Sequence, residues 1–198
     1  TDGRPVPLIA ETGGQNAMIV DSSALAEQVV ADAVVSAFDS AGQRCSALRV
    51  LCLQEDIADR VLEMLEGAMA ELSVGNPERL AVDVGPVIDD DARSMLVKYI
   101  DGMRARGHRV HQVSVDAAAD KTSNRGTFVP PPLISIDRIE QLEREVFGPV
   151  LHVLRYRREE LDRLVDGINA LGYGLTRGGH SRVDGKIDRG VRRAHAGN

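Results

Sequence analysis

The sequence predicts an α/β fold in which an open, mostly parallel sheet is flanked by helices. Short apolar segments alternate with longer amphipathic segments, and this alternation is typical of strand–helix–strand units. The run Arg49-Val50-Leu51-Cys52-Leu53 shows little polar alternation, as expected for a strand that helices cover on both faces. At 198 residues, with 43% hydrophobic and 27% charged residues, the chain suits one domain with a sizeable core.

The other strands are predicted from short apolar runs between turn-forming residues. Prolines exclude residues 128–134 from a helix and from the interior of a sheet ladder, so an extended segment is expected there. Residues 117–126 have the composition of a solvated loop. Further strands are expected at residues 6–10, 17–20, 110–115 and 150–154.

Helices are predicted where apolar residues recur every three or four positions. Ser22 and Ser23 can cap the first helix through their hydroxyl groups. The third begins near Asp89 and is expected to bury Met95, Leu96, Tyr99, Ile100 and Met103. The five helices are expected at about residues 25–38, 57–72, 89–107, 157–169 and 183–194.

Composition excludes several classes of function. The net charge of -6 predicts no nucleic-acid partner for this segment, and no 18-residue apolar run predicts a transmembrane helix. Two cysteines cannot form a disulfide framework, so a reducing, cytoplasmic setting is expected. The five histidines lack the spacing of metal ligands, and no metal site is predicted.

Cys45 is the candidate with the most informative surroundings. A free cysteine is most often a small buried hydrophobe, which is the interpretation for Cys52 in its apolar strand. Cys45 instead ends the polar, glycine-bearing run Ser40-Ala41-Gly42-Gln43-Arg44-Cys45-Ser46, between a predicted helix and a strand. Glu11 lies upstream, before two glycines. A thiol and a carboxylate in one pocket would form a nucleophile and a general base.

Three segments together resemble the aldehyde dehydrogenase family. They are residues 11–16, 40–46 and 145–150. The amino-acid sequence of residues 38–49, 86–89 and 146–153 is similar to that of the glutamate semialdehyde (1-pyrroline-5-carboxylate) dehydrogenase branch found in bifunctional proline-utilisation proteins. The resemblance implies oxidation of an aldehyde, L-glutamate γ-semialdehyde, to L-glutamate with NAD as hydride acceptor, during proline degradation.

The resemblance also implies roles for individual residues. Cys45 would be the nucleophile, Glu11 the general base, and Ser46 a group that helps to hold the substrate carboxylate. Glu145 and Phe147 would contact NAD, with Glu145 on the ribose hydroxyls of the nicotinamide half. From the residues alone, Glu145 is a helix-end carboxylate and Phe147 a core aromatic, and these interpretations stay open.

The resemblance runs from about residue 8 to residue 198 and covers well under half of a complete aldehyde dehydrogenase. We expect residues 1–198 to be a truncated catalytic domain, without the cofactor-binding domain or the oligomerisation hairpin, and inactive by itself. The parent is expected to be a homo-oligomer, and FAD is expected only if a proline dehydrogenase domain is present. Near the end, Arg177 stands where the family has an aromatic residue, and Gly179 replaces an apolar one.

Two other classes of function are consistent with the sequence. One is a nucleotide-independent cysteine hydrolase or acyltransferase, which would need a histidine to activate Cys45; His108 is the nearest in sequence. The other is a non-catalytic structural fragment.

Overall fold

The computed structural model describes residues 13–112, 126–173 and 175–197. Within these ranges six strands form one sheet in the order β3-β4-β5-β2-β1-β6, and every neighbouring pair except β3–β4 is parallel. The strands are β1 (Asn16–Val20), β2 (Leu48–Gln54), β3 (Val110–Gln112), β4 (Pro132–Ile136), β5 (Leu151–Tyr156) and β6 (Arg177–His180). The helices are α1 (Ala26–Phe38), α2 (Glu55–Ala70), α3 (Asp90–Ala105), α4 (Leu161–Ala170) and α5 (Asp184–Arg193).

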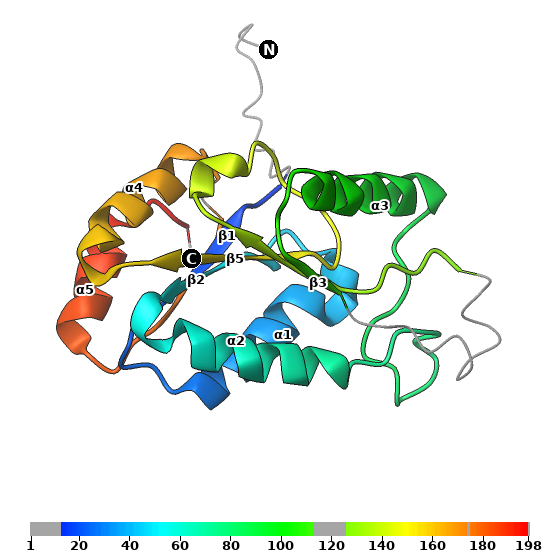
Figure 1. The fold of residues 1–198 in the computed structure, drawn as a ribbon, viewed down its shortest axis with the longest axis horizontal. Helices are drawn as coiled ribbons and strands as arrows, with labels where there is room; N and C mark the ends of the chain where they lie inside the picture. The colour runs from blue at the N-terminus through cyan, green and yellow to red at the C-terminus, as the bar shows by residue number, and fades with distance from the viewer. Residues whose placement is uncertain (1–12, 113–125, 174, 198) are drawn as a thin grey trace, which may run out of the picture.

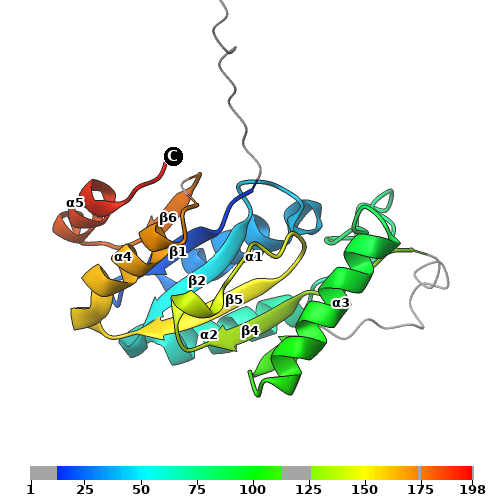
Figure 2. The same ribbon diagram turned by 90° about the horizontal axis from the view of Figure 1, so that it is seen from above.

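Helices lie on both faces of this sheet. Figure 1 shows α1 and α2 below the strands, whereas α3 and α4 lie above them. In the view from above, α5 lies beside α4 at the end of the sheet formed by β6 (Figure 2). The predicted fold class, an open and mostly parallel sheet flanked by helices, is therefore confirmed.

β2 is the centre of the sheet and of the core. It pairs in parallel with β1 on one side and with β5 on the other. All seven of its residues are buried, as its continuous apolar run predicted. Arg49, its second residue, is only 1% exposed. A charge in such a position requires partners inside the protein.

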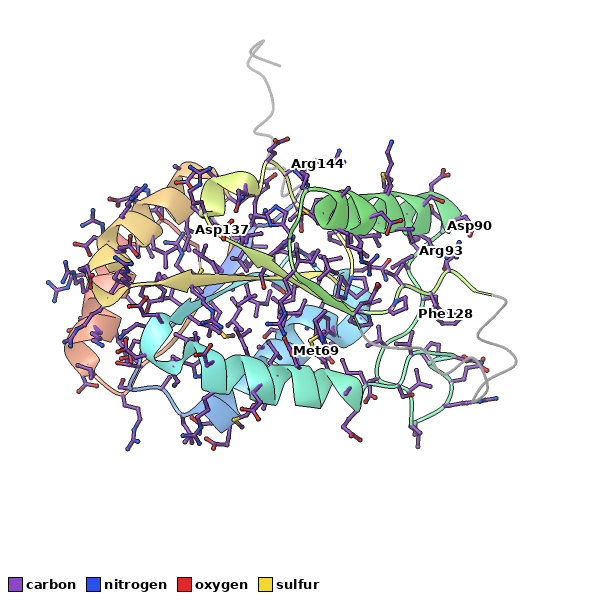
Figure 3. The ribbon with its side chains drawn as sticks, viewed as in Figure 1. Met69, Asp90, Arg93, Phe128, Asp137 and Arg144 are labelled. Atoms are coloured by element: carbon purple, nitrogen blue, oxygen red, sulfur yellow. The ribbon has the colours of Figure 1, made fainter. Side chains whose placement is uncertain are left out.

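The helices below the sheet bury most of the apolar residues that predicted their inner faces, but Leu25, expected on the inner face of the first helix, is 44% exposed. Met69 of α2 is fully buried between its helix and the strands (Figure 3). The predicted capping of α1 by Ser22 or Ser23 is wrong, because Leu25 occupies the N-cap position without a side-chain bond. The Ser23 hydroxyl instead donates to Asp21 Oδ1.

α3 begins as predicted, but it buries fewer of its apolar residues than the sequence predicted. Asp89 caps it, with Oδ1 accepting a hydrogen bond from the Ala92 N–H at 2.8 Å. Met95 is 62% exposed, which contradicts the prediction for that residue. The buried positions Leu96, Ile100 and Met103 follow the four-then-three spacing of one helix face, and position 95 lies off that face.

The last part of the chain contains a strand that the sequence did not predict. β6 pairs in parallel with β1, although two of its four residues are Gly178 and Gly179, which contribute no apolar side chain to a periodic pattern. α5 lies where it was expected but buries none of its residues. Pro132 starts β4, a position that tolerates the missing N–H. The predictions for residues 6–10, 113–115 and 117–125 lie outside the described residues.

A buried imidazole ties α3 to the centre of the sheet. His152 of β5 is 1% exposed, and its two ring nitrogens lie 3.0 Å from the Arg49 carbonyl oxygen and 2.8 Å from Tyr99 Oη. A carbonyl oxygen can only accept, so Nδ1 carries the proton and Nε2 accepts from the Tyr99 hydroxyl. Burial in the core lowers the pKa of His152 to about 4.

We expect this histidine to make stability depend on pH. Below about pH 6.5 the unfolded chain binds a proton on His152, whereas the folded protein does not until about pH 4. Stability should therefore fall as the pH drops through this window, by about 3 kcal/mol from this group. In His152→Gln, urea unfolding at pH 6.5 and pH 4.5 should show a smaller loss than in the wild type. His195→Gln, at an exposed position, should keep the wild-type dependence. The same loss in all three proteins would contradict the assignment.

Candidate active site

The segment before β2 makes a turn of rare backbone conformation. Ser40, Ala41 and Gly42 have consecutive positive φ angles of 58°, 52° and 64°. This region costs a residue with a side chain about 1–2 kcal/mol. A Cβ on Gly42 would also lie 2.2 Å from the carbonyl oxygen of Gly148. The turn is therefore pressed against the segment before β5, and only glycine fits at the contact.

Arg49 joins these two segments from inside the protein. Its Nη1 donates to the carbonyl oxygens of Gly42 at 2.7 Å and Gly148 at 3.1 Å. Nη2 donates to the Arg44 carbonyl oxygen at 3.1 Å and to Glu145 Oε1 at 2.9 Å, and Nε donates to Glu145 Oε1 at 3.1 Å. These bonds use all five N–H groups of the guanidinium. Burial lowers the pKa of Arg49, and the ion pair with Glu145 opposes that shift.

Glu145 is held on both carboxylate oxygens. While Oε1 accepts from Arg49, Oε2 accepts from the backbone N–H of Gly14 at 3.0 Å. A Cβ on Gly13 would lie 2.4 Å from Oε2, so this approach requires glycine at position 13. Three of about four acceptor positions are thus used. The side chain is 11% exposed and keeps one acceptor position on Oε2 for a ligand.

Phe147 is not the core aromatic that its residue type suggested. The side chain is 49% exposed, and its ring centroid lies 5.1 Å from Cζ of Arg49. The cation supports the ring from the protein side. Phe147 therefore presents an open aromatic surface next to Glu145.

Asn16 fixes the backbone on both sides of Ser46. Its Nδ2 donates to the carbonyl oxygens of Cys45 at 2.7 Å and Ala47 at 2.8 Å. Its Oδ1 accepts from the Thr176 N–H at 3.1 Å, so all three partners agree on the orientation of the amide. The side chain is buried, at 4% exposure. The peptide that carries the thiol is consequently tied to the first residue of β1.

The two thiols have opposite environments. Cys52 is fully buried, and burial raises its pKa to about 12, which keeps it protonated and unreactive. Cys45 is exposed, as is Ser46 beside it. Arg44 precedes Cys45, and its Nη2 donates to the carbonyl oxygens of Val35 at 3.0 Å and Ser36 at 3.2 Å, at the end of α1. The thiol available to a ligand in this region is that of Cys45.

The structure thus brings together most of the segments that the sequence singled out. Cys45 and Ser46 precede β2, Glu145 and Phe147 precede β5, and Arg49 connects the two segments. Glu11 lies outside the described residues. Cys45, Ser46, Glu145 and Phe147 lie at the amino-terminal edge of the parallel strands.

No role for Arg49 or Asn16 was predicted from the sequence. A signal for Arg49 was present, because an arginine in an otherwise continuous apolar strand needs buried acceptors. Asn16 precedes an apolar run as many turn residues do, and its contacts with residues 45, 47 and 176 carry no local signal.

Comparison with known proteins identifies the family of this chain. The model of the aldehyde dehydrogenase family matches residues 2–198. The chain belongs to this family. It is 60% identical over 197 residues to the bifunctional protein PutA of Klebsiella aerogenes, covering 99% of this chain and 15% of PutA. It is 31% identical over 193 residues to the 1-pyrroline-5-carboxylate dehydrogenase of Geobacillus thermodenitrificans (strain NG80-2), covering 96% of this chain and 36% of that protein.

The likeness extends to the fold. A crystal structure of a bifunctional proline utilization A (PutA) protein matches with a TM-score of 0.92 and 50% identity, over 100% of this chain and 19% of that one. The chain therefore spans about 15–19% of the length of these PutA proteins. Membership in the aldehyde dehydrogenase family, inferred from three short segments, is confirmed over nearly the whole chain.

Two classes of site have no counterpart in the part of the chain that the structure describes. None of its helices is long and apolar enough to cross a bilayer. No group of three or more His, Cys, Asp or Glu side chains is arranged there to hold a metal ion.

We expect Gly42→Ala to destabilise the protein by more than its φ angle alone would cost. Gly107 has a φ of +85° but open space around its missing side chain, so Gly107→Ala isolates the conformational cost, about 1–2 kcal/mol. At Gly42 the new methyl group would also displace the Gly148 carbonyl group. Urea unfolding should show the larger loss for Gly42→Ala. Equal losses in the two variants would show that the close contact is not energetically important.

Arg49→Met should cost about 3–5 kcal/mol of unfolding free energy, because it leaves a nearly buried carboxylate without its partner. Arg60 forms an exposed pair with Glu27, so Arg60→Met should cost at most about 1 kcal/mol. Adding Glu145→Leu to Arg49→Met should recover part of the loss, since the unpaired charge is then removed. Urea denaturation of the four proteins measures these values. A cost for Arg49→Met as small as that for Arg60→Met would contradict the central role of the guanidinium.

Proposed function

We propose that this chain supplies the thiol-bearing part of an aldehyde dehydrogenase that oxidises L-glutamate γ-semialdehyde to L-glutamate in proline degradation, with NAD as hydride acceptor. The similarity to PutA and to a 1-pyrroline-5-carboxylate dehydrogenase supports this substrate. The observation that carries the proposal is that Cys45 is exposed while its backbone is held in place. Asn16 donates a hydrogen bond to the Cys45 carbonyl oxygen, and Arg49 donates one to the Arg44 carbonyl oxygen.

In this proposal the Cys45 sulfur, as thiolate, adds to the carbonyl carbon of the aldehyde. Bound NAD supplies the acceptor for the hydride that leaves this carbon. The acyl group then stays on Cys45 as a thioester. Glu11 takes a proton from a water molecule, whose oxygen attacks the acyl carbon while the sulfur leaves. L-Glutamate is released and the thiol is free again.

The surroundings of Cys45 suit such a sequence of steps. The fixed carbonyl groups of residues 42, 44 and 45 hold the peptide in one geometry, which favours repeated attack from the same position. Ser46 is exposed directly beside the thiol. Its hydroxyl would donate to the carboxylate of the substrate, the group that distinguishes glutamate semialdehyde from a neutral aldehyde.

The two residues assigned to NAD each have an at least partly exposed group that could contact it. Glu145 keeps one acceptor position, enough for a ribose hydroxyl, and Phe147 offers an open ring. The ribose contact would be made by a carboxylate that Arg49 already orients. A homo-oligomeric parent in the cytoplasm, with FAD only where a proline dehydrogenase domain is present, belongs to the same proposal.

The arrangement of the histidines does not favour a cysteine hydrolase. All five lie among the described residues, and the ring contacts of four of them are made with residues other than Cys45. His152 is bound to Tyr99 and to the Arg49 carbonyl group, and the His108 ring lies 3.0 Å from the Ser135 carbonyl oxygen. His180 faces Asp32 at 3.1 Å. The activation of Cys45 by a histidine therefore has no support in the described residues.

The proposal is tested by trapping the acyl group. In the complete dehydrogenase that we propose contains this chain, Glu11→Gln should slow thioester hydrolysis, so that glutamate semialdehyde and NAD leave a glutamyl group on Cys45. Intact-protein mass spectrometry should detect the added mass, and peptide mapping should place it. Adding Cys52→Ser should leave the adduct in place, whereas adding Cys45→Ser should abolish it. An adduct on another residue, or none with Glu11→Gln, would contradict the assigned roles.

A further inference from the structure

A cavity lies on the face of β6 that α4 and α5 cover, and neither Cys45 nor Ser46 lines it. Its volume is about 520 Å³, within the range of about 300–1,000 Å³ that is usual for small-molecule sites. It extends to the carboxyl ends of β1 and β6, opposite to the edge that holds the candidate active site. Much of its wall is aliphatic, formed by Ile19, Leu161, Val165, Ile187 and Val191.

Glycines keep this cavity open. Gly179 lies opposite Ile19 of β1, two positions after Arg177 and so on the same face of β6. A Cβ on Gly179 would meet only the Ile19 carbonyl oxygen, at 3.6 Å, which leaves room for a side chain. Gly190 of α5 also lines the cavity, and a Cβ there would meet nothing within 4 Å.

Arg177 brings an incompletely paired cation to this wall. Its Nη1 donates to Asn169 Oδ1 at 2.8 Å, which is a neutral partner. Within residues 13–112, 126–173 and 175–197, no carboxylate forms an ion pair with its guanidinium, and burial lowers the pKa of Arg177. The other basic groups of the wall are differently placed. Lys186 is paired with Asp21 at 3.2 Å, Arg189 with Asp162 and His180 with Asp32, and Arg158 is exposed to solvent.

We propose that this cavity binds a small organic monocarboxylate with an aliphatic body. The carboxylate would accept hydrogen bonds from the remaining N–H groups of Arg177, whose planar fork suits two-point contact with such a group. The aliphatic part would lie against Ile19, Val165 and Val191. This site is independent of the chemistry proposed for Cys45, because none of the residues assigned to that chemistry lines the cavity.

The charges in the wall favour a monoanion over a dianion. The half-buried guanidinium of Arg177, which has no acidic partner among the described residues, compensates a single negative charge. Asp21, Glu159 and Asp162 also line the cavity, and they would repel the second charge of a phosphate group. The aliphatic side chains add apolar surface that inorganic phosphate cannot use. A short fatty acid satisfies both requirements.

Calorimetric titration of the 198-residue chain with hexanoate tests the proposal, with hexanol as the neutral match and inorganic phosphate as the dianion. Hexanoate should bind, and hexanol and phosphate should bind at least about tenfold more weakly. Arg177→Gln should weaken hexanoate roughly tenfold to a hundredfold, the effect expected for hydrogen bonds to a charged group. Arg182→Gln, an exposed position outside the cavity wall, should leave the affinity unchanged.

Gly179→Val provides a second variant that keeps the cation but fills the space. Valine suits a strand, and the position has room for it, so the variant should keep its circular dichroism spectrum and lose hexanoate binding. Gly179→Val also tests whether hexanoate binds in this cavity if Arg177→Gln does not fold. Absence of hexanoate binding to the wild type, or equal affinity in the wild type and in a folded cavity variant, would overturn the proposal. Equal affinity for hexanol or phosphate would overturn the monocarboxylate assignment.

Discussion

The buried guanidinium of Arg49 is the interaction on which the rest of this site depends. Removing a charge from water is costly unless hydrogen bonds replace the water around it. Here five donors meet one carboxylate oxygen and three carbonyl groups, from residues 42, 44, 145 and 148. The charge therefore restricts the backbone: displacement of either segment would leave a donor or an acceptor unpaired in the core. The peptide of Cys45 and the carboxylate of Glu145 consequently form one rigid unit.

The position of this unit in the sheet explains why its contacts are made by side chains and backbone carbonyl groups and not by the N-termini of helices. Ligands of open α/β sheets commonly bind beyond the carboxyl ends of the strands, where helices present their N-termini. The candidate active site is at the opposite edge, where the chain enters β2 and β5. α1 ends nearby, and its last carbonyl groups accept hydrogen bonds from Arg44. Positive charge at this edge therefore comes from arginines, not from a helix dipole.

The sequence was sufficient for elements with a continuous or periodic apolar pattern and insufficient where long-range contacts decide. The run from Val50 to Leu53 identified the central strand, and Asp89 identified the start of α3. β6 was not predicted, because glycines gave it no pattern and its pairing with β1 is set by residues about 160 positions earlier. The exposed Phe147 and the contacts of Asn16 also arise from distant segments. Cys45 was singled out by its local turn and Ser46 by the resemblance to a family, whereas the contacts of Arg49 near them include the distant Glu145.

Two buried or half-buried arginines show how the same side chain can serve structure or recognition. Arg49 has an acceptor for each of its five N–H groups, so no ligand could bind it without displacing a protein partner. Among the described residues, Arg177 has one hydrogen-bond partner, the neutral amide of Asn169, and it adjoins a cavity that Gly179 keeps open. A guanidinium in that condition still carries most of its capacity to bind an anion, at a site that the surrounding protein has partly desolvated. The structural role of Arg49 and the binding role proposed for Arg177 therefore differ mainly in the number of N–H groups without an acceptor, and less in burial or charge.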